Sequence, residues 1–337
     1  MKKALITGGG GFLGRALAKE LKKSGYEVRV MGRRDYPNMK KDGFDTFKGD
    51  VADYDSVYEA CKDIDIVFHA ASLASIRGKY AEFHNTNVVG TENVIKACRE
   101  HSIRKIVYTS SPSVVFDGKT HLNMDESLPY PTEYLAHYPE TKAIAERMII
   151  EANDKNLLTV SLRPHLIWGP GDTNLIPRLL ERAKKGNLMI VGSGHNIIDN
   201  TFIDNAVDAH ILAAEKLVDG SVVAGQCYFI TQGEPVKCWD WINNILRGFN
   251  IPLLEKRVSF NAAYRGGAIL ELVYWMLGIN SEPRMTRFLA AQLATSHTYS
   301  IEKAKRDLGY MPKVSTAEGM ERLFRYDFGS KAHSADG

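Results

Sequence analysis

The 337-residue sequence contains few cysteines, the residues that form disulfides and bind metals. Its four cysteines, Cys61, Cys98, Cys227 and Cys238, form no CxxC pair and show no metal-ligand spacing. A chain of this length does not need disulfides to fold, so we interpret them as reduced structural thiols. The scarcity of cysteine therefore excludes a disulfide-stapled scaffold.

Long apolar runs are also missing. The most apolar segment, residues 262–277, contains Arg265 and Glu271, and no run approaches the ~20 residues of a membrane-spanning helix. We predict no membrane span and interpret this segment as core packing, with an apolar face for a hydrophobic ligand or partner as the alternative. The apolar run at residues 4–6 is too short for a signal peptide, so a cytoplasmic protein is expected.

The sequence also lacks a large excess of either positive or negative charge. The 43 lysines and arginines oppose 40 aspartates and glutamates, which leaves a net charge of +3. This balance does not favour a nucleic-acid-binding surface, and no internal repeat is visible. We therefore expect a small-molecule partner and no nucleic acid.

What the sequence does contain is an alternation of short β-branched apolar runs with amphipathic segments, typical of a parallel sheet joined by right-handed crossovers. The predicted strands are residues 4–7, 27–31, 45–48, 64–69, 105–109 and 158–162. The predicted helices include residues 12–24, 56–62, 87–101 and 139–153. The fold class is therefore α/β: a doubly wound parallel sheet (Rossmann) with a smaller, mainly helical C-terminal substrate lobe.

A glycine-rich turn follows the first predicted strand and precedes an amphipathic helix. A dinucleotide pyrophosphate needs close backbone approach and the free N–H groups of a helix N-terminus, and this context provides both. GxGxxG spacing alone would also suit a structural turn, but the flanking strand and helix favour nucleotide binding. The predicted contacts are Gly8, Gly11, Phe12, Leu13 and Gly14.

The second predicted strand is followed by Gly32-Arg33-Arg34. An acidic residue here would select NAD through the ribose 2′-hydroxyl, whereas two guanidinium groups suit a 2′-phosphate. The pair predicts NADP(H), with a solvated arginine pair as the alternative, and Asp35 leaves NAD(H) open. Further cofactor contacts are predicted where the third and fourth strands end, at Asp50, which could accept from the adenine amino group, and at Val51, Ala70 and Ala71.

These assignments divide the chain into interleaved lobes. Residues 1–165 are predicted to form the NADP(H)-binding domain together with 200–232, because 201–217 and 227–230 are expected to return to the sheet. Residues 166–199 and 233–328 form the predicted substrate-binding lobe, and the polar residues 329–337 a disordered tail.

Tyr138 and Lys142 lie four residues apart at the start of a predicted helix, which places both on one face. A tyrosine with a pKa near ~10 is a poor acid–base catalyst at neutral pH, but a neighbouring ammonium stabilises the phenolate. This spacing is common by chance, and its weight comes from its position after Ser110-Ser111, at the carboxyl end of the fifth strand. The pair therefore indicates a candidate catalytic site.

Several motifs in this order resemble the extended short-chain dehydrogenases/reductases. They occupy residues 7–14, 49–50, 69–71, 87–91, 108–111, 138–142 and 162–164. Residues 163–172, 202–210 and 306–310 resemble the 3β-hydroxysteroid dehydrogenase branch of that group. Residues 111–118, 232–242 and 285–297 are similar to the bacterial reductases that act on 2-alkyl-3-oxoalkanoates in long-chain olefin biosynthesis.

The resemblance implies a role for each candidate residue. Tyr138 would be the general acid in reduction, and Lys142 would bind the nicotinamide ribose and lower the Tyr138 pKa. Ser111, chosen over Ser110 and Ser113 by its spacing, would hydrogen-bond the substrate carbonyl. The further NADP(H) contacts that it implies are Pro164 and Ile167.

The leading expectation is NADPH-dependent reduction of the 3-keto group of a long-chain 2-alkyl-3-oxoalkanoic acid. A 3β-hydroxysteroid or sterol-carboxylate dehydrogenase is the alternative. A nucleotide-sugar epimerase and a non-catalytic NADP(H)-sensing protein are less favoured, because residues 262–277 are apolar and Ser111, Tyr138 and Lys142 occur together. The resemblance also implies a homo-oligomer associated with other olefin-pathway enzymes.

Other polar groups near the site have simpler interpretations. The histidines His69, His137 and His165 lack metal-ligand spacing, so we predict packing or supporting roles and no metal. The basic residues that follow are expected to form a solvated helix face, with docking of a substrate carboxylate as the alternative; they are Arg178, Arg182, Lys184 and Lys185.

Overall fold

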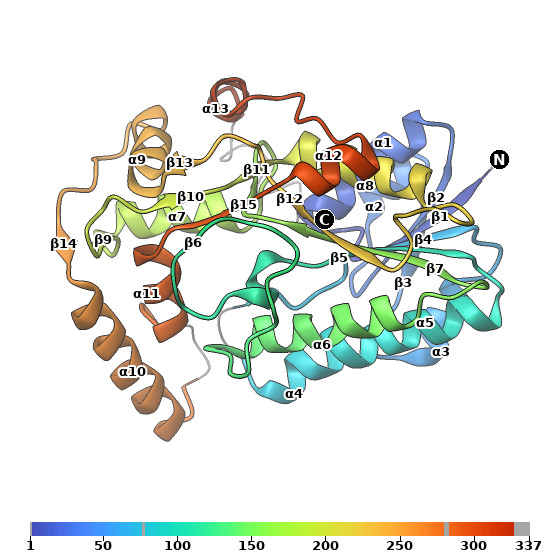
Figure 1. Cartoon of the computed structure of the whole chain (residues 1–337), viewed down its shortest axis with the longest axis horizontal. Coiled ribbons are helices and arrows are strands. Elements are labelled where there is room, and N and C mark those ends of the chain that lie inside the picture. The colour runs from blue at the N-terminus through green and yellow to red at the C-terminus, as the bar shows by residue number, and fades with distance from the viewer. Residues whose placement is uncertain (1, 76–77, 280–282, 327–337) are drawn as a thin grey trace.

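Seven parallel strands form the main sheet of the molecule, in the order β12-β7-β5-β4-β1-β2-β3 (Figure 1). The computed structural model describes residues 2–75, 78–279 and 283–326. Most of the strand residues are buried, because helices cover both faces of a parallel sheet. The strands are β1 Lys3–Thr7, β2 Glu27–Gly32, β3 Asp45–Lys48, β4 Ile66–His69, β5 Lys105–Thr109, β7 Leu158–Pro164 and β12 Gln226–Ile230.

Two groups of helices cover the main sheet. On one face α1 (Phe12–Lys23) contacts α8 (Ile203–Lys216), and on the other α5 (Gly90–Glu100) lies between α3 (Tyr54–Ala60) and α6 (His137–Glu151) (Figure 1). The strand order reverses between β1 and β4. Ligands bind at such a reversal, outside the carboxyl ends of the strands, so the topology alone locates the candidate site.

A second lobe lies at one end of the main sheet, on the left in Figure 1. Its four-stranded sheet has the order β13-β10-β15-β6, and β15 runs parallel to both β6 and β10. These strands are β6 His121–Met124, β10 Ile197–Ile198, β13 Val236–Lys237 and β15 His297–Tyr299. The helices of this lobe are α7 Leu175–Lys184, α9 Cys238–Gly248, α10 Phe260–Met276 and α11 Arg287–Ala294.

Short elements complete the fold. α12 (Glu302–Leu308) packs against α8 and β12 of the main sheet. The others are β8 Ile167–Trp168, β9 Ile190–Val191, β11 Thr201–Phe202, β14 Arg257–Val258, α2 Pro37–Lys41, α4 Tyr80–Phe83, α13 Thr316–Phe324, the π-helix η1 His84–Val89 and the 3-10 helix η2 Pro112–Val115. Within the described residues, no helix has the length and apolar composition to cross a membrane.

The structure confirms the predicted α/β fold class. The six predicted strands agree with the observed ones to within two residues, and residues 227–230 return to the sheet as β12. Residues 201–217 return mainly as helix α8, which covers a face of the sheet. The helix predicted at 87–101 begins as the π-helix η1 and continues as α5, a change of helical type that the sequence did not indicate.

Candidate active site

The glycine turn between β1 and α1 is shaped for close backbone contacts. Gly8 has a φ of +69°, and a Cβ atom there would lie 2.7 Å from the backbone of Ala71. A Cβ atom at Gly14 would lie 2.4 Å from the carbonyl oxygen of Gly8. At Gly11 a Cβ atom would meet only the Gly8 oxygen, at 3.2 Å. The turn is therefore packed on its inner side and open at the N-terminus of α1, as a pyrophosphate requires.

The end of β2 carries the predicted arginine pair. Arg33 and Arg34 are both exposed. Asp35, which left NAD(H) open, lies 3.1 Å from the Nζ atom of Lys48, so its charge faces a cation. The local charge at this strand end is therefore basic.

Tyr36 is a residue of this region that the sequence did not single out. A Cβ atom on Gly10 would lie 2.0 Å from the Tyr36 ring, and one on Gly32 would lie 2.1 Å from its hydroxyl oxygen. The ring thus lies directly against both glycines, over the turn. The sequence could not identify Tyr36, because only the fold brings its ring against the two glycines.

One cavity of about 540 Å³ brings the candidate catalytic residues together. Ser111, Tyr138 and Lys142 all line it, although Ser111 lies directly before η2 and the other two lie in α6. Of the predicted cofactor contacts, Phe12, Leu13, Ala70, Pro164 and Ile167 also line it. The remaining ones lie outside its lining, in the glycine turn or at the ends of β2, β3 and β4; they are Gly8, Gly11, Gly14, Arg33, Arg34, Asp50, Val51 and Ala71.

Tyr138 and Lys142 lie in the first turns of α6. The Lys142 side chain is buried, and its Nζ atom donates to the carbonyl oxygen of Thr109 at 2.5 Å and lies 4.1 Å from the centre of the Tyr108 ring. Burial lowers the pKa of Lys142 to about 7, and the charge of Glu146 acts against this. Burial raises the pKa of Tyr138, against the hydrogen-bonding effect of Ser111. At neutral pH the phenol is therefore protonated and can act as an acid.

Ser111, the serine predicted to contact the substrate, lines the cavity together with Ser110 and Ser113. Ser111 caps η2, and its Oγ atom accepts from the backbone N–H of Ser113 at 3.2 Å. The Ser113 hydroxyl lines the same cavity, is buried and has no hydrogen-bond partner among the described residues. Ser113 thus remains a second candidate contact for a substrate.

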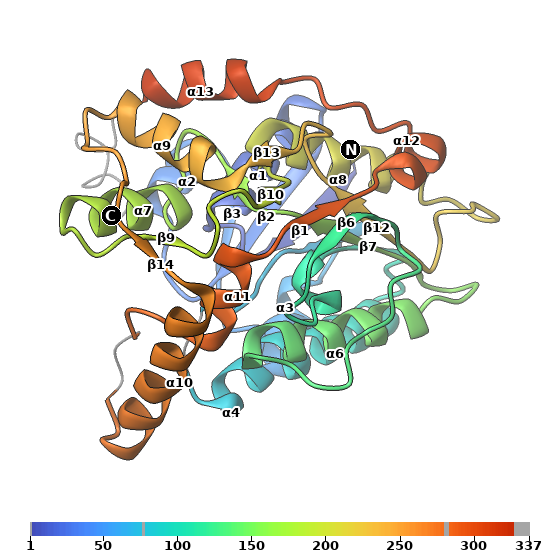
Figure 2. The same cartoon turned by 60° about the vertical axis from the view of Figure 1, so that its left-hand side comes forward.

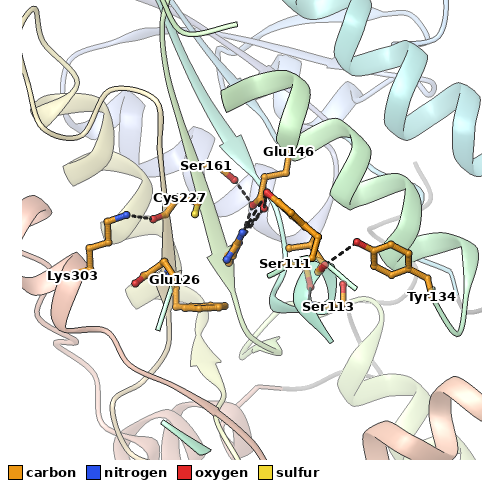
Figure 3. A network of polar contacts seen from close by, with 12 residues as sticks. Ser111, Ser113, Glu126, Tyr134, Glu146, Ser161, Cys227 and Lys303 are labelled. Atoms are coloured by element: carbon orange, nitrogen blue, oxygen red, sulfur yellow. Dashed lines mark hydrogen bonds and ion pairs between the residues drawn. The ribbon is translucent and has the colours of Figure 1, made fainter. Parts of the chain in front are cut away.

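A buried ion pair lies one helical turn beyond Lys142. The carboxylate of Glu146 accepts from Arg163 at 2.6 Å and from the hydroxyls of Ser161 at 2.7 Å and Tyr130 at 2.8 Å. Figure 3 shows Glu146 and Ser161 pointing toward each other from α6 and β7. Burial alone would raise the pKa of Glu146, but Arg163 and Ser161 hold it below its usual value. A fixed negative charge therefore lies beside Lys142.

Asn87, in the π-helix η1, connects the two sides of the site. Its Oδ1 atom accepts from the backbone N–H of Leu73 at 2.8 Å, and its Nδ2 atom donates to Thr141 at 3.0 Å. The loop after β4 is thereby fixed to the helix that carries Lys142. π-Helical turns occur often at functional sites, but no residue pattern predicted this one.

The histidines divide into two groups. His69 is fully buried and hydrogen-bonds Thr7 at 2.7 Å and Thr91 at 2.9 Å, which fits the predicted packing role. His165 and His297 instead line the cavity, with ring centres 4.9 Å apart. Burial lowers the pKa of His297 to about 4 and that of His165 well below its usual value, so both are neutral at pH 7. Within the described residues, no group of three or more His, Cys, Asp or Glu could hold a metal ion.

The second lobe supplies an apolar wall to the same cavity. Side chains of α7, β10, α9 and α11 form this wall together with Leu188 of the loop after α7; they are Leu175, Leu179, Leu188, Ile198, Trp241, Ile242, Phe288, Leu289 and Leu293. Arg178 and Arg182 of α7 also line the cavity, so the basic helix face is not wholly directed to solvent. The arrangement suits a largely apolar molecule with a polar or anionic group.

Comparisons with known proteins agree with this geometry. A family model described as 3-beta hydroxysteroid dehydrogenase/isomerase matches residues 5–261. A 2-alkyl-3-oxoalkanoate reductase of Stenotrophomonas maltophilia (strain K279a) is 48% identical over 325 residues, 95% of this chain and 98% of the relative. The decarboxylating sterol-4-alpha-carboxylate 3-dehydrogenase of Mus musculus is 38% identical over 331 residues, 95% of this chain and 90% of the relative.

The solved structures show the same fold. MoeE5 in complex with UDP-glucose and NAD has a TM-score of 0.74 at 24% sequence identity, over 96% of this chain and 97% of that one. At this identity the likeness concerns the fold alone.

Proposed function

The chain belongs to the 3-beta hydroxysteroid dehydrogenase/isomerase family of oxidoreductases, and on that premise we propose that it reduces the 3-keto group of long-chain 2-alkyl-3-oxoalkanoic acids with NADPH. The observation that carries the proposal is one cavity with Ser111, Tyr138 and Lys142 on one side and apolar side chains of the second lobe on the other. The 48% identical reductase supports the substrate class. By the same likeness, the enzyme would work as a homo-oligomer with other enzymes of olefin biosynthesis.

The residues of the site have complementary roles in this reaction. A bound nicotinamide dinucleotide would supply the hydride that adds to the ketone carbon. Tyr138 donates its phenolic proton to the developing alkoxide oxygen, and Ser111 donates a hydrogen bond to the same oxygen. Lys142 binds the cofactor ribose and, when protonated, favours the Tyr138 phenolate that remains. The phenolate then regains a proton from solvent.

The cofactor assignment depends on the surface at the end of β2. Arg33 and Arg34 would pair with a 2′-phosphate through charge-assisted hydrogen bonds, and Lys48 offsets the charge of Asp35. Arg178 and Arg182 line the cavity itself and would attract the substrate carboxylate. The alkyl chains would then lie along the apolar wall.

The test is a spectrophotometric comparison of substrates and cofactors. We expect oxidation of NADPH with a 2-alkyl-3-oxoalkanoic acid, and a kcat/KM at least about tenfold lower with NADH. The double variant R33S/R34S should raise the KM for NADPH by about tenfold or more while leaving the KM for NADH unchanged. A preference for NADH in the wild-type enzyme would contradict the cofactor assignment.

A sterol-carboxylate or 3β-hydroxysteroid dehydrogenase is the second candidate. It is favoured by the 38% identical mouse enzyme, and the same catalytic residues operate in the oxidative direction. Reduction of NADP⁺ with a hydroxysteroid, together with no turnover of the keto acid, would decide for this reaction.

A further inference from the structure

Three buried polar atoms belong to residues that line the cavity and have no hydrogen-bond partner among the described residues. They are the Nδ1 atoms of His165 and His297 and the hydroxyl oxygen of Ser113. All three residues are at least nine-tenths buried. Buried polar atoms are nearly always hydrogen-bonded in folded proteins, because an unpaired one loses its contacts with water. Such a cluster on a cavity marks a place where a ligand forms hydrogen bonds.

The main sheet places His165 beside the segment that carries Ser111. β5 and β7 are neighbouring parallel strands, and the backbone N–H of Ser110 donates to the carbonyl oxygen of Leu162 at 2.6 Å. His165 directly follows β7, so it leaves the sheet at the same edge as Ser110 and Ser111. His165 is therefore next to the candidate catalytic residues.

His297 reaches the same place from the second lobe. It lies in β15, and Figures 1 and 2 show the chain running from α11 through this strand to α12. The ring centre of His297 lies 4.9 Å from that of His165 and 5.9 Å from that of Phe116, the residue that caps the end of η2. Two imidazoles from different lobes, which we call the histidine pair, thus meet beside η2.

The hydrogen bonds of the histidine pair can accommodate one additional proton. The Nε2 atom of His297 lies 2.9 Å from the carbonyl oxygen of Gln292, so Nε2 carries the hydrogen and Nδ1 has a lone pair. A cationic His165 would have two N–H groups, one for this lone pair and one for a ligand. Burial and the neighbouring imidazole lower the pKa of His165, and a bound anion would act in the opposite direction.

Ionisable groups of the second lobe surround the histidine pair but form no ion pair with it within the described residues. Tyr299 lies 5.5 Å from His165 between ring centres, and burial raises its pKa, so it is neutral at pH 7. The carboxylate of Asp199 accepts from the backbone N–H of Tyr299 at 2.6 Å. Asp117 pairs with His121 at 3.1 Å.

The charged residues that line the cavity are mainly basic. Lys142 donates to Thr109, and Arg178 and Arg182 project from α7. Asp172 is the one acidic residue of the described lining, and its carboxylate accepts from three backbone N–H groups at the start of α7. The surroundings of the histidine pair therefore suit an anionic ligand.

We propose that the histidine pair is a receptor for the substrate carboxylate, which binds together with one proton from solvent. His165 then donates to the carboxylate, and His297 accepts from His165. The inference rests on the proposed function, because the carboxyl group of that substrate is bonded to the carbon next to the keto carbon. With the keto oxygen at Ser111 and Tyr138, the carboxylate lies beside the histidine pair. Arg178 and Arg182 attract the anion into the cavity, and the histidine pair binds it directly.

The test measures binding, so it does not depend on turnover. A 2-alkyl-3-hydroxyalkanoic acid, the product of the proposed reaction, and its methyl ester are titrated calorimetrically into the full chain, in two buffers with different ionisation enthalpies. We expect uptake of about one proton with the acid and none with the ester. Because a proton is taken up, the affinity for the acid should fall about tenfold or more between about pH 6 and 8, and that for the ester should stay constant.

Two matched variants distinguish proton uptake from packing. His165→Gln keeps hydrogen-bonding groups but cannot become cationic, so we expect it to bind the acid at least about tenfold more weakly, without proton uptake, and the ester as the wild type does. His195→Gln, at an exposed position outside the cavity lining, should behave as the wild type.

The outcomes separate this proposal from the proposed function. Binding of the acid by the wild type without proton uptake, or the same uptake in His165→Gln, would overturn the receptor even if the keto acid is reduced. Binding of neither the acid nor the ester would overturn the receptor together with the proposed substrate class. The wild-type titrations decide the question even if His165→Gln does not fold.

Discussion

α6 and α10 are helices of 15 and 17 residues with opposite relations to water. α6 buries Lys142 and Glu146, side chains that are usually exposed, and α10 exposes Trp275 and Met276, which are usually buried. In α6 the buried charges have partners in Thr109 and Arg163, so their burial is compensated.

In α10 no described part of the chain covers the side chains of Trp275 and Met276. The comparison teaches that burial follows the available partners. Charged side chains are buried in α6 because other groups compensate them, and apolar side chains stay exposed in α10 because no described residue packs over them.

The largest expected effect comes from removing the carboxylate of Glu146, which compensates the buried charge of Arg163. In Glu146→Gln, Arg163 loses its buried counter-charge, and we expect the free energy of unfolding to fall by about 3–5 kcal/mol. Urea denaturation measures this loss. Glu140→Gln, at a partly exposed position of the same helix, is the matched control, and equal stability of the two variants would contradict the prediction.

The next effect concerns the chemical step. Tyr138→Phe removes the proton donor but keeps the ring, so we expect kcat to fall by roughly 100-fold or more while the Kd for NADPH changes little. Stopped-flow or steady-state oxidation of NADPH provides the measurement. Tyr134→Phe, which loses only a hydrogen bond to the Val114 carbonyl, should keep near-normal turnover. Normal turnover in Tyr138→Phe would contradict the proposed role of Tyr138 as the proton donor.

The smallest effect is a pH dependence. Because burial lowers the pKa of Lys142 to about 7, its ammonium form is lost as pH rises through that value. We expect the affinity for NADPH to fall by up to about tenfold between roughly pH 7 and 9.

The matching control is Lys142→Met, for which a fluorescence titration with NADPH should give an affinity that does not change with pH. Unfolding would not explain a loss of affinity in the wild-type enzyme. The lowered pKa of Lys142 makes the free energy of unfolding rise with pH between about 7 and 10.5. A flat profile in the wild-type enzyme would contradict the assigned role of Lys142.

Much of the main sheet could be predicted because most of its strands are short, mainly apolar runs bounded by turns. The second sheet could not, because β10 and β13 have two residues each and β15 pairs His297 with His121, far away in the sequence. Nothing in the local composition of such segments distinguishes them from loops. The π-helix η1 was missed for a related reason, since helical periodicity does not reveal where an extra residue is inserted.

The candidate site, like the two sheets, could be predicted only in part from the sequence. Ser111, Tyr138 and Lys142 were identified from spacing and strand position, and the structure places all three on one cavity. His165 and His297 also line it, but their meeting depends on the path of the second lobe, which no motif encodes. The catalytic roles themselves stay predictions.

The burial of Glu146 and Arg163 also determines how the enzyme responds to salt. Dissolved ions screen charges that they can approach, within about 8 Å at physiological ionic strength, but they cannot approach a buried pair between α6 and β7. Salt therefore has little effect on the field that Glu146 exerts on Lys142, whereas it would screen the proposed attraction of the exposed Arg33 and Arg34 for a phosphate. Raising the ionic strength should therefore weaken binding of the cofactor and leave the rate of proton transfer unaffected.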